Sequence, residues 1–296
     1  MGAAVTDADR RIGDLIQRIT LESPLRAAGF IVTIYGDVVE PRGGVAWVGN
    51  LIETCATVGI SETLVRTAVS RLVAAGQLVG EREGRRSYYG LSQAARTEFA
   101  VAATTLFGGT DDHGWQFAHA LGDAPEETMA ALERMGYSRL NARLAFGPIR
   151  HLDSSHRVLL FKVGTISSEP GLREFVAENW DLLRYKAAYQ AFLEQFSPLA
   201  DGVVESDLTP AMTLTARLLL IHRFRSVLLH DPRLPDDALP TGWPGREARV
   251  LFARLYIALS SAADRYIAEN FISPAGSLMA RSSATDQRLA SLQRSA

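Results

Sequence analysis

This chain of 296 residues has little of what several protein classes require. It has a single cysteine, Cys55, so an internal disulfide is excluded, and the apolar helical pattern around Cys55 is typical of a small core residue. No apolar run is long enough to cross a membrane, and the N-terminus lacks the continuous apolar segment of a secretory signal. These absences predict a cytoplasmic protein without a membrane partner.

The patterns of common catalytic and metal sites are absent too. The six histidines show neither HxxxH nor HExxH spacing, and there is no CxxC, so metal ligation is not predicted. No G-x-S-x-G, P-loop or G-x-G-x-x-G pattern occurs, which removes the usual signatures of hydrolases and of nucleotide and dinucleotide sites. We therefore expect no cofactor and no enzymatic activity.

Basic and acidic residues are nearly equal in number, 31 and 33. The net charge is -2, and only Lys162 and Lys186 among the 31 basic residues are lysines, so almost all positive charge is arginine. Because the whole chain does not attract phosphate, any binding to nucleic acid must be local. With 47% hydrophobic and 22% charged residues, the chain is a folded one with room for two or three domains.

A candidate DNA-reading helix follows a glycine turn at residues 58–60. Ser61 is expected to cap a helix that begins at about Glu62. Apolar residues at helical spacing are expected to bury one side of it, and they are Leu64, Val65, Ala68, Val69 and Leu72. The other side carries short polar side chains and arginine, which can reach base edges or phosphates in a major groove. These candidate contacts are Thr63, Arg66, Thr67 and Ser70, with Arg71 at the flank.

A basic hairpin is expected directly after this helix. Residues 77–80 and 87–91 have the pattern of two short strands, joined by a glycine-containing turn with three arginines. Guanidinium groups on such a wing can grip phosphates. The candidate contacts here are Arg82, Arg85, Arg86, Ser87 and Tyr88. The alternative is an ordinary amphipathic helix and a solvated hairpin whose charge is partly cancelled by Glu81 and Glu83.

Two further helices complete a winged helix-turn-helix domain over residues 24–110. They are expected at 25–39 and 47–57, before the turn and the reading helix. A short amphipathic extension, residues 1–23, precedes the domain and is ended by Pro24. Its apolar positions are Ile12, Leu15, Ile16 and Ile19.

Several motifs in this region resemble those of the PaaX family, the repressors of phenylacetate catabolism. They are Thr33-Ile34-Tyr35-Gly36-Asp37, Pro41-Arg42-Gly43-Gly44, SETLVRTAVSRL and EGRRSYYGL, followed later by Trp180-Asp181-Leu182 and HRFRSVLLHDPRLPDDALPTGWPG. The resemblance covers residues 24–271. It implies a repressor that binds a double-stranded DNA operator, forms a homodimer and responds to phenylacetyl-CoA or a related aryl-CoA.

Residues 111–168 are expected to form a small ferredoxin-like α/β domain. A strand at WQFAHAL, a helix at 125–135 and strands at 143–146 and 157–163 give a βαββ run. The resemblance implies that this region dimerises, although residues 119–122 depart from the family pattern. Asp123 could be a nuclease metal ligand, but Pro125 and Glu126 favour a helix cap at this position.

Residues 169–272 are expected to form a helical domain that binds the effector. Aromatic residues at helical spacing are usually core, but they can also line a pocket for a flat acyl group. The candidate effector contacts are Trp180, Arg184, Tyr185, Tyr189, Arg223 and Arg225. The tail, residues 273–296, is rich in serine, alanine and arginine and is predicted to be disordered.

The sequence therefore predicts a mainly α protein with α+β parts. The functional hypothesis is a sequence-specific repressor of an aromatic acid catabolic operon, relieved by an aryl-CoA thioester. The alternative is an enzyme, either a metal-dependent nuclease centred on Asp123 or an acyl-CoA-processing protein with an accessory DNA-binding domain.

Overall fold

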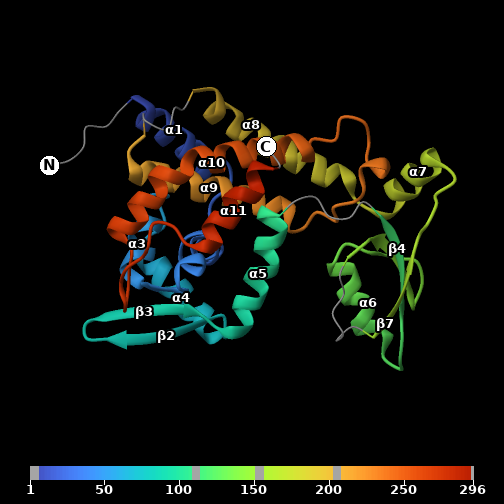
Figure 1. The fold of residues 1–296 in the computed structure, drawn as a ribbon, viewed down its shortest axis with the longest axis horizontal. Coiled ribbons are helices and arrows are strands. Elements are labelled where there is room, and N and C mark those ends of the chain that lie inside the picture. The colour runs from blue at the N-terminus through green and yellow to red at the C-terminus, as the bar shows by residue number, and fades with distance from the viewer. Residues whose placement is uncertain (1–6, 109–113, 151–156, 203–207, 295–296) are drawn as a thin grey trace. The chain divides into compact units, whose positions relative to one another are not determined.

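The computed structural model describes residues 7–108, 114–150, 157–202 and 208–294, and within these ranges the chain is mainly helical with three antiparallel sheets (Figure 1). The predicted class, mainly α with α+β parts, is confirmed at this level. The chain divides into two compact units. We call them the helical unit (Met1–Gly108, Ala191–Ser226 and Glu247–Ala296) and the sheet unit (Gly109–Gln190 and Val227–Arg246). No helix in the described ranges is both long and apolar enough to cross a membrane.

The N-terminal part of the helical unit follows the predicted order of helices and hairpin. The expected helix at 25–39 begins at Ala27 and changes to a π-helix for its last turn, and Gly43, at φ 103°, then reverses the chain. The elements are α1 (Asp7–Glu22), α2 (Ala27–Ile34), the π-helix η1 (Tyr35–Val39), the 3-10 helix η2 (Glu40–Arg42), β1 (Val45–Trp47), α3 (Val48–Ala56), α4 (Glu62–Ala74), β2 (Leu78–Glu83), β3 (Arg86–Leu91) and α5 (Gln93–Phe107).

The three-stranded sheet of this unit has the order β1-β3-β2. Its hairpin strands are longer than predicted, because Glu83 pairs with Arg86 and only Gly84 and Arg85 remain in the turn. Gly84 has φ 58°, the left-handed region that a tight hairpin turn requires. No local pattern predicted β1, which pairs Ala46 with Tyr89 and makes β3 the central strand.

The remaining elements of the helical unit lie in the chain after residue 181, and they include ordered elements in the tail. The prediction of a disordered tail is wrong for residues 273–294, where a β-hairpin and a capped helix form. Ser282 begins that helix in a capping box with Thr285, and Leu292 is fully buried. These elements are α8 (Leu182–Gly202), which begins in the sheet unit, α9 (Pro210–Leu228), α10 (Gly245–Asn270), β8 (Ile272–Ser273), β9 (Gly276–Ser277) and α11 (Ser283–Gln293).

Aromatic rings of three helices form much of the core of the helical unit. Phe224 of α9 stacks on Phe252 of α10 at 4.3 Å between centroids, and Phe192 of α8 lies 5.2 Å from Phe224. Tyr256 continues the row to Phe107 at the end of α5, 5.2 Å away. The core interpretation of the aromatic pattern is confirmed for Phe192 and Phe196 of α8, which are 2% and 1% exposed.

A buried ion network joins the first helices of the helical unit to α9 and α10. Arg217 pairs with Asp37 (2.9 Å) and Asp264 (2.8 Å), Arg42 pairs with Asp264 (2.7 Å), and the Tyr256 hydroxyl donates to Asp37 (2.8 Å). Burial works to lower the pKa of Arg217, but Asp37, Tyr256 and Asp264 raise it on balance. Two arginines and two aspartates balance in charge, as a buried cluster needs.

The two compact units do not coincide with the predicted division into a DNA-binding domain at 24–110 and a separate effector domain at 169–272. Most residues of both ranges belong to one compact unit. A change in α9 or α10 can therefore reach η1 and η2 through direct contacts.

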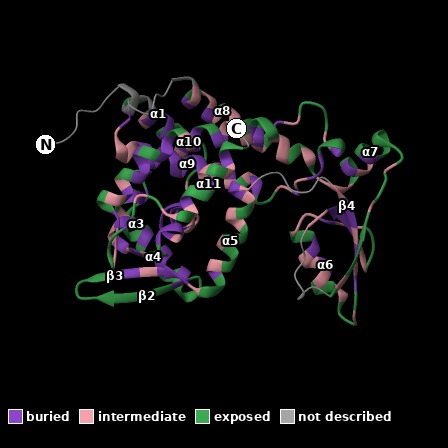
Figure 2. Ribbon diagram, in the orientation of Figure 1, coloured by how far each residue is buried: buried purple, intermediate pink, exposed green. Residues whose placement is uncertain are grey.

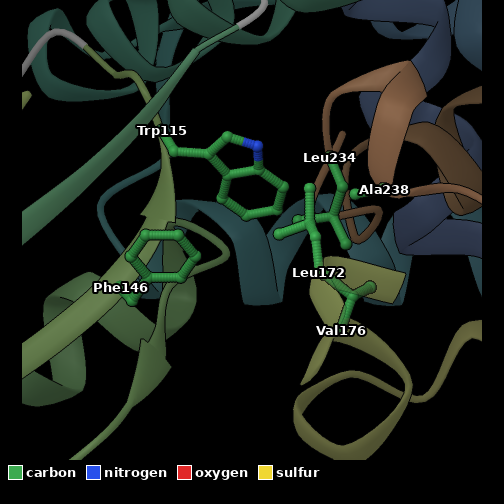
Figure 3. Packing of buried hydrophobic residues seen from close by; sticks show 6 residues of the cluster. All are labelled: Trp115, Phe146, Leu172, Val176, Leu234 and Ala238. Carbon is green, nitrogen blue, oxygen red and sulfur yellow. The ribbon is translucent and has the colours of Figure 1, made fainter. Parts of the chain in front are cut away.

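The sheet unit contains the strand–helix–strand–strand order that was predicted. Its sheet has the order β5-β6-β4-β7, with the core cluster of Figure 3 around the stacked rings of Trp115 and Phe146, 4.9 Å apart. A complete ferredoxin-like fold has a second helix and a fourth long strand; α7 follows β7, but no later described strand joins this sheet. The elements are β4 (Trp115–Ala120), α6 (Pro125–Arg134), β5 (Ser138–Arg139), β6 (Leu144–Pro148), β7 (Val158–Lys162), α7 (Glu169–Asn179) and η4 (Asp236–Ala238).

Candidate nucleic-acid interface

The helix α4 begins where the sequence predicted. Ser61 is its N-cap, with an extended backbone, and its Oγ accepts a long hydrogen bond of 3.5 Å from the Leu64 N–H. Four of the five predicted apolar residues are buried, and they are Val65, Ala68, Val69 and Leu72. The fifth assignment is wrong, because Leu64 is 55% exposed. At 3.6 residues per turn Leu64 lies about 90° from the middle of the buried stripe, which is too far round to reach the core.

The polar side of α4 faces solvent. All five of its predicted contacts are exposed: Thr63, Arg66, Thr67, Ser70 and Arg71. The Arg66 guanidinium donates from Nε to Glu62 Oε1 at 2.7 Å, one turn earlier on the same helix, and both side chains are more than half exposed. An exposed pair of this kind is worth little, so Arg66 can leave Glu62 for a base or a phosphate at small cost.

The hairpin of β2 and β3 extends from the same unit, with β2 exposed over almost its whole length (Figures 1 and 2). Arg82, Arg85 and Arg86 are exposed, as predicted for a phosphate-gripping wing. Arg86, the first residue after the hairpin turn, lies over the ring of Trp47 of β1 at 5.3 Å, a cation–π contact between the hairpin and β1. Glu81 and Glu83 are exposed beside them and reduce the local charge.

Two predicted hairpin contacts are less accessible. Ser87 is half-buried, and Tyr88 is only 4% exposed. Side chains alternate between the two faces of a strand, and Tyr88 lies on the inner face of β3, opposite Trp47 of β1. The assignment of Tyr88 as a DNA contact is therefore corrected to a core residue.

Three hydrogen bonds of residues that were not predicted from the sequence connect this surface to the rest of the helical unit. The Tyr35 hydroxyl donates to the Tyr89 carbonyl of β3 at 2.8 Å. Asn50 of α3 donates to the Asn270 carbonyl (2.8 Å), and its Oδ1 accepts from the Ile272 N–H (2.9 Å). The available signal was a polar side chain on an otherwise apolar helix face, because a buried amide needs partners.

The candidate effector residues belong to both units and already make structural contacts. Trp180 donates from Nε1 to the Gly136 carbonyl (2.9 Å), and the buried Tyr189 donates to Asp231 (2.5 Å), all in the sheet unit. Burial raises the pKa of Asp231. Arg184 is exposed and Tyr185 half-buried.

The other two effector candidates lie in the helical unit, on α9. Arg223 donates to the Ile19 and Ser23 carbonyls at the end of α1, at 2.9 and 2.6 Å, and Arg225 donates to the Gly29 carbonyl of α2 at 3.3 Å. The six residues therefore do not form one site within either unit.

The surroundings of Asp123 correct its interpretation as a helix cap. Asp123 is exposed, the N-cap of α6 is Ala124, and no side chain caps this helix end. Glu126 does not reach back but accepts from Arg139 at 2.9 Å, and this hydrogen bond lowers the pKa of Glu126. Among the residues with described positions, no three His, Cys, Asp or Glu side chains gather to hold a metal ion.

An exposed polar helix beside an arginine-bearing hairpin defines a candidate nucleic-acid-binding surface, and comparisons with known proteins identify the family. The family model of the PaaX-like protein matches residues 26–95, and that of the PaaX-like protein C-terminal domain matches residues 180–269. The chain is 30% identical over 304 residues to the transcriptional repressor PaaX of Escherichia coli (strain K12), covering 95% of this chain and 96% of that protein. The chain belongs to the PaaX family, which confirms the resemblance found in the sequence.

A solved structure is also similar, that of the uncharacterized protein Rv0674 from Mycobacterium tuberculosis. The similarity covers 74% of this chain and 91% of that one, with 22% identity and a TM-score of 0.45.

Proposed function

We propose that this protein is a sequence-specific DNA-binding repressor of an aromatic acid catabolic operon, acting in the cytoplasm as a homodimer. The observation that carries the proposal is the exposed polar face of α4 beside the basic hairpin, in a chain whose Escherichia coli relative is a transcriptional repressor. In this proposal α2, α3, α4 and the β1-β3-β2 sheet are a winged helix-turn-helix, and α4 enters the major groove.

The exposed side chains of α4 and the hairpin are proposed to have two roles, contacts to bases and contacts to phosphates. Arg66, Thr63, Thr67 and Ser70 face the base edges, where hydrogen-bond patterns differ between base pairs. Arg71, Arg82, Arg85 and Arg86 face phosphates, which fixes position but carries no sequence information. Because the net charge is only -2, these local contacts must supply nearly all of the attraction.

The sheet unit is proposed as the ferredoxin-like dimerisation region, so that two copies of α4 meet two half-sites of an operator. β7 is an edge strand, and Leu159, Leu160 and Phe161 on it are exposed to 47%, 38% and 51%. An unpaired edge with apolar side chains favours pairing with another chain. A second copy is the partner that a palindromic operator requires.

The effector is proposed to be an aryl-CoA thioester such as phenylacetyl-CoA, bound by the C-terminal helical region. Arg184 is the exposed member of the six candidates, and the half-buried Tyr185 follows it on α8, so these two are proposed to meet a ligand phosphate and ring. Such a ligand relieves repression only if it binds the DNA-incompetent arrangement more tightly than the competent one.

Two substitutions of equal charge test the assignment of α4 and the hairpin. We expect Arg66→Ala to weaken binding to the operator by about 1–3 kcal/mol while leaving nonspecific duplexes almost unaffected, because a base contact is lost. We expect Arg85→Ala to weaken all duplexes similarly and to reduce the slope of log affinity against log salt by about one, because a phosphate contact is lost.

The control is Arg246→Ala, which removes an exposed positive charge from the sheet unit. Binding titrations at several salt concentrations, on an operator duplex and on a scrambled duplex, separate the three variants. If Arg66→Ala leaves operator affinity unchanged, the assignment of α4 as the reading helix is wrong.

A further inference from the structure

Leu64 is an apolar side chain on the part of α4 where a reading helix meets bases. It is the third residue of the helix, three positions after the cap Ser61, and it is 55% exposed. Recognition helices contact base edges mainly with their N-terminal residues. Single exposed leucines are common on protein surfaces and need no explanation by themselves. The position of Leu64, between polar neighbours on a candidate reading face, is what distinguishes it.

Leu64 is not part of the buried face of α4. Val65, Ala68, Val69 and Leu72 already fill the contact of α4 with the unit, and each of them is buried. Along the helix, residues three and seven positions later share the side of Leu64, and these are the exposed Thr67 and Arg71. Leu64 therefore stands on the same exposed flank as a candidate base contact and a candidate phosphate contact.

The major groove offers one apolar group, the C5-methyl of thymine. Hydroxyl and guanidinium groups read donors and acceptors, and they gain nothing from a methyl. A leucine side chain against that methyl removes both apolar surfaces from water. Resting on the proposed function, we infer that Leu64 is a specificity-determining residue that reads the methyl group of a thymine in each half-site.

The test uses the full chain and a duplex that it selects from a randomised pool. Each thymine of that duplex is replaced in turn by deoxyuridine, which removes the C5-methyl and keeps every hydrogen-bonding group. At one thymine per half-site, the affinity of the unchanged protein is expected to fall about fourfold, the effect of one buried methyl-sized group. Leu64→Ala is expected to bind the thymine and the deoxyuridine duplexes equally at that position.

Val73→Ala is the matched control. Val73 is 38% exposed on the same helix, about 90° from the buried stripe on its other side and near the C-terminal end. This variant is expected to keep the full preference for thymine. Leu64→Ile is expected to keep most of it, because an apolar side chain remains. Circular dichroism and thermal unfolding confirm that each variant folds, since both changed positions are exposed.

The outcomes separate this inference from the function on which it rests. If the chain selects no sequence from the pool, the proposed function fails and the inference fails with it. If it selects a sequence but shows no preference for thymine over deoxyuridine, only the inference is overturned. A preference that persists in Leu64→Ala overturns it as well, and assigns the methyl contact to another side chain such as Thr63 or Thr67.

Discussion

His222 of α9 is a half-buried titratable side chain within the helical unit. Its Nδ1 lies 2.9 Å from the Thr33 hydroxyl, and its ring meets the ring of Phe30 edge-on at 5.7 Å. Burial, and then the nearby charges of Arg225 and Arg223, lower its pKa from 6.5 to about 4. The ring is therefore neutral in the folded chain at neutral pH.

We predict that this histidine makes the helical unit less stable in mild acid. Above pH 6.5 the ring is neutral in both the folded and the unfolded chain, so the full stability is present. As the pH falls from 6.5 to about 4, His222 becomes protonated in the unfolded chain but stays neutral in the folded chain. The free energy of unfolding therefore decreases. The loss amounts to roughly 3 kcal/mol at most.

Urea unfolding of the unchanged chain and of His222→Gln at pH 7 and pH 4.5 measures this loss. Glutamine keeps polar atoms that can bond to Thr33 but does not titrate. The variant should lose less stability between the two pH values than the unchanged chain. An equal loss in both would assign the acid sensitivity to other groups.

Single residues show what local sequence can and cannot predict. The cap at Ser61 was predicted correctly because it depends on the few residues that follow it. The exposure of Leu64 and the burial of Tyr88 were not predicted. Each depends on which side of its helix or strand is covered by other elements of the fold. Tyr88 lies beside Trp47 of β1, a strand with no local signal in the sequence.

At the scale of elements, residues 270–293 contact the N-terminal elements of the helical unit, with hydrogen bonds through Arg42, Asn50 and Arg288. Arg42 of η2 donates from Nε to the Met279 and Ala280 carbonyls at 3.0 and 3.1 Å, and Asn50 bonds the chain at Asn270 and Ile272. Arg288 of α11 donates to the Gly36 carbonyl at 2.9 Å. Its composition suggested disorder, but the partners of this segment are more than 200 positions away, where no local pattern reveals them.

We predict that Arg288→Ala loosens η1 and η2. The Arg288 guanidinium also pairs with Glu40 (3.3 Å) and lies over the ring of Phe107 (4.7 Å), and its side chain is 8% exposed. Its loss leaves the Gly36 carbonyl without this donor, at a cost of about 1–3 kcal/mol. Hydrogen exchange measured by mass spectrometry should show faster exchange in peptides that cover residues 35–42.

Arg281→Ala is the matched control, because Arg281 pairs with Asp286 on the same segment but is 58% exposed. An exposed pair contributes at most about 1 kcal/mol, so exchange over residues 35–42 should not change. Equally faster exchange in both variants would contradict the prediction, because it would show that the contacts of Arg288 are not what protects residues 35–42.

At the scale of the whole molecule, the residues expected to read DNA share one compact unit with two of the six candidate effector contacts, Arg223 and Arg225. The buried pairs of Arg217 with Asp37 and Asp264 lie between α9, α10 and the π-helical turn that ends the α2 segment. Breaking a buried pair by removing one partner is costly, so such a network favours one arrangement of these helices over its alternatives. A ligand that binds a second arrangement would therefore have to move the support of α4 as well.

The last prediction follows for the intact chain on its operator. Phenylacetyl-CoA should lower operator affinity at least tenfold, whereas phenylacetate, free CoA and acetyl-CoA should not, because only the aryl thioester joins a flat ring to CoA phosphates. By linkage, operator DNA must weaken binding of the thioester by the same factor, which calorimetry on the complex and on the free protein measures. If the thioester binds but operator affinity is unchanged while it is bound, the proposed relief of repression is excluded. Analytical ultracentrifugation with and without the thioester shows whether the complex is lost through the DNA contacts or through separation of two copies of the chain.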